Sequence, residues 1–422
     1  MNPLKRQFFL SYAVIGSVMP LLTVFLREQG GFDFLQIGLA MSLMSVPMLC
    51  SPALITLLAD RNLDSRRILA VAYSCSAIVL SLLYFSESIT LTLVLFLFHG
   101  LAFVAMLPLQ DGFFFSLSET QRQEGKSPPP YPAVRVWGTV GFIVPSLILF
   151  YPLSRGADAS AILPCAVGFC LLSLANSFTL PETQKRGPRS TRLPTREAFR
   201  SIFSPEARWL SIGLFFGFSA ASCYYAFIGN FLDEVVGFPK KQIGLVINLG
   251  VALEIVFTLL MPWLQRLIHL KGIMVVGLFC MSARMTLMVL FPHDWVVVLV
   301  QVFHGLEVLA LYVGPVMFLD RLATDEFRNS IQGVFTMAIG GVSRVAGGLA
   351  AGFVVTEFGL RGGMVYGSTL AGIACLIIAF LFRRIPPRTD VPRTKVPRTD
   401  VPRTEVPGSD EDDFAVSSSP SS

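Results

Sequence analysis

The sequence has little charge for its length. Only 14% of its 422 residues are Asp, Glu, Lys or Arg, against about 25% in a typical soluble domain. Hydrophobic residues make up 53% of the chain, and its mean hydropathy is +0.64. These values exclude an ordinary soluble protein and indicate a protein embedded in a membrane.

Patterns for disulfides, metal binding and catalysis are missing as well. The seven cysteines lie inside apolar runs without a Cys-x-x-Cys pair, and the four histidines show no metal spacing. Neither a disulfide framework nor a metal site is therefore expected. No nucleophile stands beside a base in a recognisable motif, which argues against an enzyme. The basic stretches lack interleaved aromatics, so we expect no nucleic-acid partner, and we expect no cofactor.

Long apolar runs dominate what is present. Lys5 and Arg6 precede the first run, which has no small-residue cleavage site, so we expect a retained helix rather than a signal peptide. A membrane-spanning helix needs about 20 apolar residues, and about twelve stretches qualify. They cover residues 7–26, 35–58, 67–86, 89–115, 134–152, 159–180, 208–231, 242–263, 271–291, 295–319, 331–354 and 363–382.

The basic residues alternate between successive loops. One set of loops holds about 20 Lys and Arg residues and the other about 5, so the positive-inside rule places both termini in the cytoplasm. We expect a multi-pass protein of a bacterial inner membrane.

A basic, proline-containing loop divides the chain. Pro188 and Pro194 should interrupt any helix in it. The last segment repeats Pro-Arg-Thr-x-Val and should be disordered. We expect an N-terminal six-helix half, a cytoplasmic central loop, a C-terminal six-helix half and a cytoplasmic tail, at residues 1–180, 181–207, 208–384 and 385–422.

The two halves look like copies of each other. His99 and His304 each stand in a Phe-His-Gly-Leu string, in the fourth helix of their half. Many transporters are built from two such halves that meet at a midplane substrate site. His99 is therefore a candidate substrate-binding residue.

The tenth predicted helix has one polar side. Gln301, His304 and Glu307 lie three residues apart and cover an arc of about 120°. A carboxylate at the bilayer centre costs at least about 2.5 kcal/mol, so it must face a cavity or a partner. This side either lines a transport path with a proton site, or holds helices together as a buried polar cluster.

Four charged residues stand on one predicted cytoplasmic turn: Asp60, Arg61, Arg66 and Arg67. They resemble the loop signature of the major facilitator superfamily, Gly-x-x-x-Asp-Arg-x-Gly-Arg-Arg, although its two glycines are replaced here. The resemblance implies an all-α membrane fold of two pseudo-symmetric six-helix halves, with these residues as a gating loop. A basic loop that only sets topology is the alternative.

The string Arg-Val-Trp-Gly-Thr-Val-Gly-Phe opens the fifth helix at residues 135–142. It is similar to the signature of the lactose permease, nucleoside–proton symporter and phenylpropionate permease branch of the superfamily. The resemblance implies that Arg135 binds substrate, that Phe142 stacks on it, and that Asp111 is the nearest candidate partner acid. Alternatively, Arg135 snorkels to the cytoplasmic surface. The two glycines allow close helix packing.

Helices seven and eight also resemble the phenylpropionate permease relatives. These relatives carry a similar Tyr-Tyr pair, here Tyr224 and Tyr225, and a similar Leu-Gly-Val-x-x-Glu, here ending at Glu254. We include both tyrosines and Asn230 among the candidate substrate-binding residues.

Arg284 lies twenty positions before His304. The helix-nine arginine of the lactose permease precedes its helix-ten His-x-x-Glu by the same interval. The resemblance implies that Glu307 takes and releases a proton, Arg284 helps deprotonate it, and Glu254 couples it to substrate. Gln301 stands where the permease has a lysine, which argues against lactose itself.

These patterns predict a monomeric proton-coupled symporter that imports a sugar, a nucleoside or an aromatic acid by alternating access. Its partners would be the solute, protons and membrane lipid. A proton-coupled drug or metabolite exporter is the alternative, although helix five lacks the Gly-x-x-x-Gly-Pro string of such exporters. A transporter-like sensor is a further one. Arg344, in a glycine-rich stretch, is an intramembrane cation without an assigned role.

Overall fold

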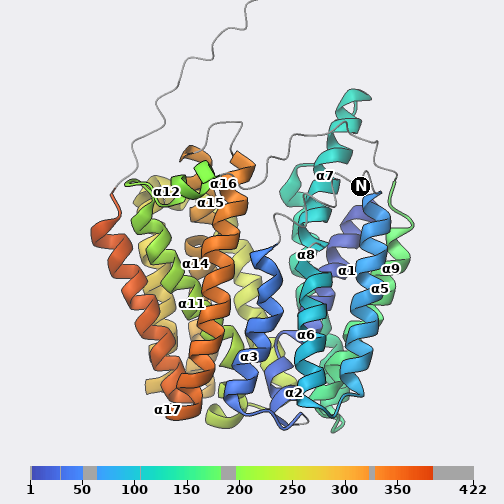
Figure 1. Ribbon diagram of the computed structural model, residues 1–422, viewed down its shortest axis with the longest axis vertical. Coiled ribbons are helices and arrows are strands. Elements are labelled where there is room, and N and C mark those ends of the chain that lie inside the picture. Colours follow the sequence, from blue (N-terminus) through green and yellow to red (C-terminus); the bar gives the residue numbers. More distant parts are fainter. Residues whose placement is uncertain are drawn as a thin grey trace, which may run out of the picture. The chain divides into compact units, whose positions relative to one another are not determined.

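The described part of the chain is helical throughout, apart from short connections (Figure 1). The computed structural model describes residues 2–28, 30–50, 64–104, 106–181, 196–322 and 328–383. Asp60 and Arg61 of the predicted gating loop, much of the predicted central loop and the predicted repeat tail lie outside these ranges.

The N-terminal half, as we use the term here, runs from α1 to α9. Its α-helices are α1 (Asn2–Val18), α2 (Leu22–Glu28), α3 (Phe34–Ser45), α5 (Ser65–Tyr84), α6 (Ile89–Val104), α7 (Met106–Gln123), α8 (Tyr131–Ser154) and α9 (Ile162–Ser177). Two 3₁₀ segments, η1 (Val46–Leu49) and η2 (Ala159–Ala161), extend α3 and precede α9.

The C-terminal half runs from α11 to η7. Its α-helices are α11 (Arg208–Asn230), α12 (Lys240–Leu290), α13 (Asp294–Leu299), α14 (Phe303–Val308), α15 (Gly314–Leu322), α16 (Arg328–Phe335) and α17 (Val342–Leu376). One segment is 3₁₀, η4 (Val300–Val302). Four segments are π-helical: η3 (Phe231–Val236), η5 (Leu309–Val313), η6 (Thr336–Gly341) and η7 (Ile377–Leu381).

Nine helical stretches in the described residues are long and apolar enough to cross a membrane. Two of them are 51 residues long and break at one residue, His269 (φ 59°) and Gly359 (φ 71°). Splitting both, and adding the shorter apolar helix Phe34–Leu49, brings the nine to twelve. The predicted number of spans is therefore reproduced, with much tighter turns at these two breaks than the sequence indicated.

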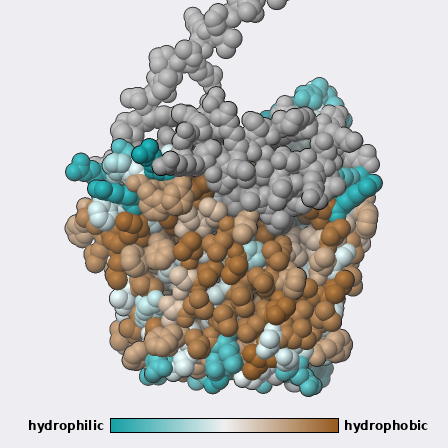
Figure 2. Space-filling model, in the orientation of Figure 1, coloured by the Kyte–Doolittle hydropathy of each residue, from teal (hydrophilic) through white to brown (hydrophobic). Residues whose placement is uncertain are grey.

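The outward face of these helices is apolar. Large hydrophobic side chains such as Val71, Phe279 and Phe380 are 63–79% exposed. Figure 2 shows a hydrophobic band across one face, with hydrophilic residues gathered toward its edges. Such a surface suits lipid, because helices satisfy their own backbone groups and can present apolar side chains to it.

The predicted central loop is not entirely a loop. Residues Arg196–Ile202 form a short helix, α10. Pro194 is the last proline before it, so nothing in the sequence prevents helix from residue 196 onward. Ile202 is buried, and its carbonyl accepts a hydrogen bond from Ser211 Oγ at 2.6 Å, which ties α10 to α11.

A neutral polar network lies inside the N-terminal half. Gln110 of α7 donates from Nε2 to the Tyr73 hydroxyl of α5 at 2.8 Å and to Ser11 Oγ of α1, and Ser11 also bonds Tyr73. Asn176 of α9 donates to Gln7 Oε1 of α1 at 2.7 Å. All five side chains are buried, so these four helices are connected by uncharged hydrogen bonds.

Glycines bring α1 and α8 into direct backbone contact. A Cβ added at Gly141 would overlap the backbone of Phe9, and one added at Gly16 would overlap the backbone of Phe142. The predicted close packing at the helix-five glycines is thus confirmed. Between the two halves, a Cβ added at Gly38 of α3 would come within 2.6 Å of the Gly348 carbonyl oxygen of α17.

We expect Gly141→Ala to lower the free energy of unfolding by about 1–3 kcal/mol, because the new methyl group must push two backbones apart. Gly168→Ala on α9 is the matched control, since a Cβ there has no atom within 4 Å and gains helix propensity. Denaturant titration of both purified variants measures the difference. Equal stability of the two variants would contradict the close α1–α8 contact.

Polar contacts join the two halves at the end of the helices where α2 stops, opposite the N-terminus (Figure 1). Lys240 pairs with Glu28, and Asn248 Nδ2 donates to Ser146 Oγ at 2.7 Å. The others are Arg27–Glu234 at 3.7 Å and Asn230 Nδ2 to the Thr23 carbonyl at 3.2 Å. This end is held closed by both ionic and neutral bonds.

Candidate functional site

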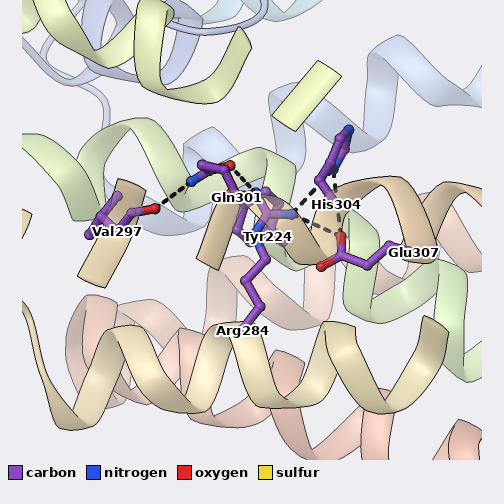
Figure 3. Close-up of polar contacts among 6 residues, drawn as sticks. All are labelled: Tyr224, Arg284, Val297, Gln301, His304 and Glu307. Carbon is purple, nitrogen blue, oxygen red and sulfur yellow. Dashed lines mark hydrogen bonds and ion pairs between the residues drawn. The ribbon is translucent and has the colours of Figure 1, made fainter. Parts of the chain in front are cut away.

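Arg284 is the centre of a buried polar cluster in the C-terminal half. Its side chain is 2% exposed. Nη1 donates to Glu307 Oε2 at 2.8 Å and lies 3.2 Å from His304 Nδ1. Nη2 donates to Gln301 Oε1 at 2.8 Å and to the Tyr224 hydroxyl. Figure 3 shows these four side chains converging on the guanidinium.

The spacing of the tenth-helix residues produces this convergence. Gln301 lies in η4, and His304 and Glu307 follow at three-residue steps in α14, so all three face α12. A Cβ at Gly250 would come within 2.9 Å of the His304 Cβ, so α12 packs closely here. The structure thus brings together the predicted residues Arg284, Gln301, His304 and Glu307, and adds Tyr224 to them.

The Arg284–Glu307 ion pair is out of contact with water. Both side chains are at most 6% exposed, and burying two charges is costly unless their hydrogen bonds are complete. They are incomplete here: within the described residues, Glu307 Oε1 and Arg284 Nε have no hydrogen-bond partner. One carboxylate oxygen is therefore free to receive a proton. His304 Nδ1 faces both Arg284 Nη1 at 3.2 Å and Glu307 Oε2 at 3.6 Å, so the tautomer of a neutral His304 decides which of the two it bonds.

Glu254 lies between this cluster and the N-terminal half. It is half-buried on α12 and makes no hydrogen bond or ion pair with another described residue. It is close enough to His304 and Arg135 for their charges to act on it. Arg135 of α8 stacks its guanidinium over the Tyr12 ring at 4.1 Å. Glu254 thus interacts electrostatically with both the Arg284 cluster and the region around Arg135.

Asp111, the candidate partner acid of Arg135, lies within electrostatic range of Arg135 without a direct ion pair. Asp111 accepts a hydrogen bond from the Tyr131 hydroxyl at 2.7 Å, and the described ion pairs do not include Asp111–Arg135. Tyr131 precedes Arg135 by one helical turn on α8 and reaches the carboxylate first. Arg135 turns instead to Tyr12. Sequence reasoning missed both tyrosines, although the four-residue step from Tyr131 to Arg135 was a usable signal.

The aromatic candidates differ in their contacts and in their exposure. Tyr225 packs edge-on against Tyr224 and His304, with ring centroids 5.4 and 6.5 Å apart, yet keeps 36% of its surface exposed. Phe142 is half-buried on α8. Tyr225 is therefore the aromatic candidate that combines contact with the cluster and an accessible surface.

Two candidates belong to other contacts. Asn230 is one of the ties between the halves, through the Thr23 carbonyl. His99 is buried, bonds Ser76 Oγ through Nδ1 at 3.1 Å, and stacks on Phe103 with centroids 5.7 Å apart. The structure does not bring either residue into hydrogen-bond contact with Arg284.

In the described part of the predicted gating loop, Arg66 has an ion-pair partner that the sequence did not predict. Arg66 forms an ion pair with Asp64 at 2.7 Å, and Asp64 caps α5. Hydrogen bonds from Arg66 hold the pKa of the Asp64 carboxyl below its usual value. Arg67 is exposed.

The twelve apolar spans of the described residues, with a buried, incompletely bonded ion pair in the C-terminal half, match the architecture of a membrane transporter of the major facilitator type. The chain belongs to the MFS_1 like family, whose model matches residues 2–362. This confirms the predicted resemblance and all-α membrane fold, and the protein is a transporter and not an enzyme.

Relatives and solved structures agree over nearly the whole chain. The putative nucleoside transporter YegT of Escherichia coli is 22% identical, over 90% of this chain and 93% of its own. The E. coli xanthosine permease is 23% identical, over 85% and 88%. The crystal structure of the nucleoside transporter NupG superposes with a TM-score of 0.78 at 18% identity, over 91% of this chain and 99% of that one.

Proposed function

We propose that this protein is a proton-coupled symporter that imports a small organic solute of the nucleoside class. The observation that carries the proposal is the buried Arg284–Glu307 ion pair, with His304 beside it and one Glu307 oxygen without a partner. A buried carboxylate with a free oxygen can exchange a proton, and an adjacent guanidinium can return it to the charged form.

The cluster has two charge states with different demands. When Glu307 is ionised, its negative charge balances the positive charge of Arg284. Once Glu307 takes a proton, Arg284 keeps its charge and relies on Gln301, His304 and Tyr224. An uncompensated buried cation is costly, so this state should favour a substrate that offers acceptor atoms. Proton and solute would therefore bind together.

Several accessible groups suit a nucleoside. Tyr225 offers an exposed ring for stacking, and Arg135 offers a rigid fork of donors to hydroxyl groups. Glu254 supplies an acceptor without a partner among the described residues. Proteins named as nucleoside transporters among the relatives support this class.

We propose a bacterial inner-membrane location with both termini in the cytoplasm, since the basic loops gather on one side. The closed end that carries Glu28 and Lys240 would then face outward, so the site would open to the cytoplasm in this state. The protein would act as a monomer in the lipid bilayer, with the proton as coupling ion and no other cofactor.

Uptake of labelled uridine into proteoliposomes tests the proposal. An acid outside pH should drive accumulation above the external concentration, and a protonophore should abolish it. Vesicles with the opposite gradient distinguish an importer from the exporter alternative, which would accumulate uridine only when the inside is acidic. Failure of both gradients to drive any movement of uridine would overturn nucleoside symport.

A further inference from the structure

Arg344 is a cation inside a membrane-spanning segment. It lies near the middle of the span that runs from Ile331 to the break at Gly359, on the first turn of α17, and is half-buried. A guanidinium at this depth is expensive and is normally paired or turned toward a water-filled cavity. The family resemblance gave it no role.

Arg344 makes only long polar contacts for a half-buried cation inside a membrane span. Nη2 donates to the Tyr312 hydroxyl at 3.2 Å, while Nη1 reaches the Gly340 carbonyl at 3.4 Å and Met48 Sδ at 3.5 Å. The guanidinium carbon lies 5.2 Å from the Phe218 ring centre. Within the described residues, no carboxylate lies in ion-pair range of Arg344.

This sets Arg344 apart from Arg284 and Arg135. Arg284 is paired with Glu307 at 2.8 Å, and Arg135 lies within electrostatic range of Asp111 and Glu254. Of these three, Arg344 is the one for which the described residues provide no neighbouring acid.

The surroundings of Arg344 come from both halves of the protein. Met48 belongs to η1 of the N-terminal half, whereas Phe218 and Tyr312 belong to α11 and η5 of the C-terminal half. Tyr312 and Gly340 both lie in π-helical segments, η5 and η6, which frequently mark functional sites. A group at this junction can sense how the halves are arranged.

The Arg344 region is also connected to the proton cluster. Tyr312 and Tyr225 are near enough to influence each other electrostatically, and Tyr225 packs against Tyr224 and His304. Tyr225 and Tyr312 therefore connect the Arg284 cluster with the surroundings of Arg344.

We propose that Arg344, with the Tyr312 hydroxyl, is an anion subsite that binds a carboxylate carried by the transported aromatic or heteroaromatic solute. This inference rests on the proposed function and adds that the solute carries a carboxylate. The guanidinium fork matches a carboxylate in two parallel hydrogen bonds, the Tyr312 hydroxyl can donate a third, and the substrate supplies the negative charge that the described residues around Arg344 do not provide.

Matched pairs of probes test the subsite in the purified full-length protein. Orotidine differs from uridine by one carboxylate, and 3-phenylpropionate differs from 3-phenylpropionamide by the charge of its end group. We expect the acid of at least one pair to bind about tenfold or more tightly than its neutral partner, as is typical of hydrogen bonds to charged groups. Isothermal titration calorimetry measures all four affinities.

Three variants identify the residue responsible. Arg344→Gln should remove the preference for the acid and change binding of the neutral probe less than twofold. Arg344→Lys keeps the charge without the fork and should keep part of the preference, which guards against a variant that simply misfolds. Arg361→Gln, an exposed arginine further along α17, is the matched control and should change nothing.

Equal affinity for both members of each pair, a preference that survives Arg344→Gln, or no binding of either acid would overturn the subsite. Proton-driven uridine uptake separates this result from failure of the proposed function. If uridine still accumulates, the symporter stands and only the anion subsite is lost.

Discussion

Replacing Glu307 with glutamine is expected to abolish proton-driven accumulation of solute while leaving solute exchange intact. Glutamine has the shape of the carboxylic acid and can still accept a hydrogen bond from Arg284, but it cannot bind or release a proton. A 100 mV potential supplies about 2.3 kcal/mol per charge, equivalent to about a fiftyfold concentration ratio. The variant should not exceed a ratio of one.

Two assays on the same proteoliposomes distinguish coupling from transport itself. Counterflow exchange needs no net proton movement and should persist in Glu307→Gln, whereas uphill uptake should vanish. Glu357→Gln is the matched control, because Glu357 is an exposed carboxylate on α17. Uphill uptake that survives in Glu307→Gln would show that another group carries the proton.

Replacing Arg284 with methionine should produce the largest loss of stability. The change leaves the Glu307 carboxylate buried without its cation and removes the donors to Gln301, His304 and Tyr224. Removing one partner of a buried ion pair costs about 3–5 kcal/mol. Unfolding of the purified protein in mixed detergent micelles measures this cost.

A second substitution separates charge from packing. The double variant Arg284→Met, Glu307→Leu should recover most of the lost stability, because a buried ion pair exchanged for apolar residues is often neutral or stabilising. It should nevertheless fail to accumulate solute. A loss below about 1 kcal/mol in the single variant would mean that water reaches the pair, contrary to its burial here.

Helical spacing explains why the core of the site could be predicted from sequence. Gln301, His304 and Glu307 share one helical face, so their proximity to one another is a local property of the chain. The contact with Arg284 spans two helices, and only the twenty-residue interval to His304 indicated it. Both expectations agree with the observed hydrogen bonds.

The remaining features depend on packing that no local pattern encodes. Asp111 lies within electrostatic range of Arg135, but it accepts its hydrogen bond from Tyr131. Arg135 stacks on Tyr12, a residue more than 100 positions away in the sequence. A loop was predicted where α10 forms. Two prolines precede this segment, and their interrupting effect on a helix does not extend into it. His99 and His304 stand in the same tetrapeptide, yet His99 forms a hydrogen bond with Ser76, whereas His304 contacts Arg284.

The neutral network of Ser11, Tyr73 and Gln110 has a consequence for stoichiometry. Its side chains carry no charge at neutral pH, so its hydrogen bonds neither take up nor release protons during a cycle. If Glu307 is the coupling group, this network adds nothing to the number of protons moved per solute. Evolution can then alter these three side chains without changing the energetic yield of each turnover.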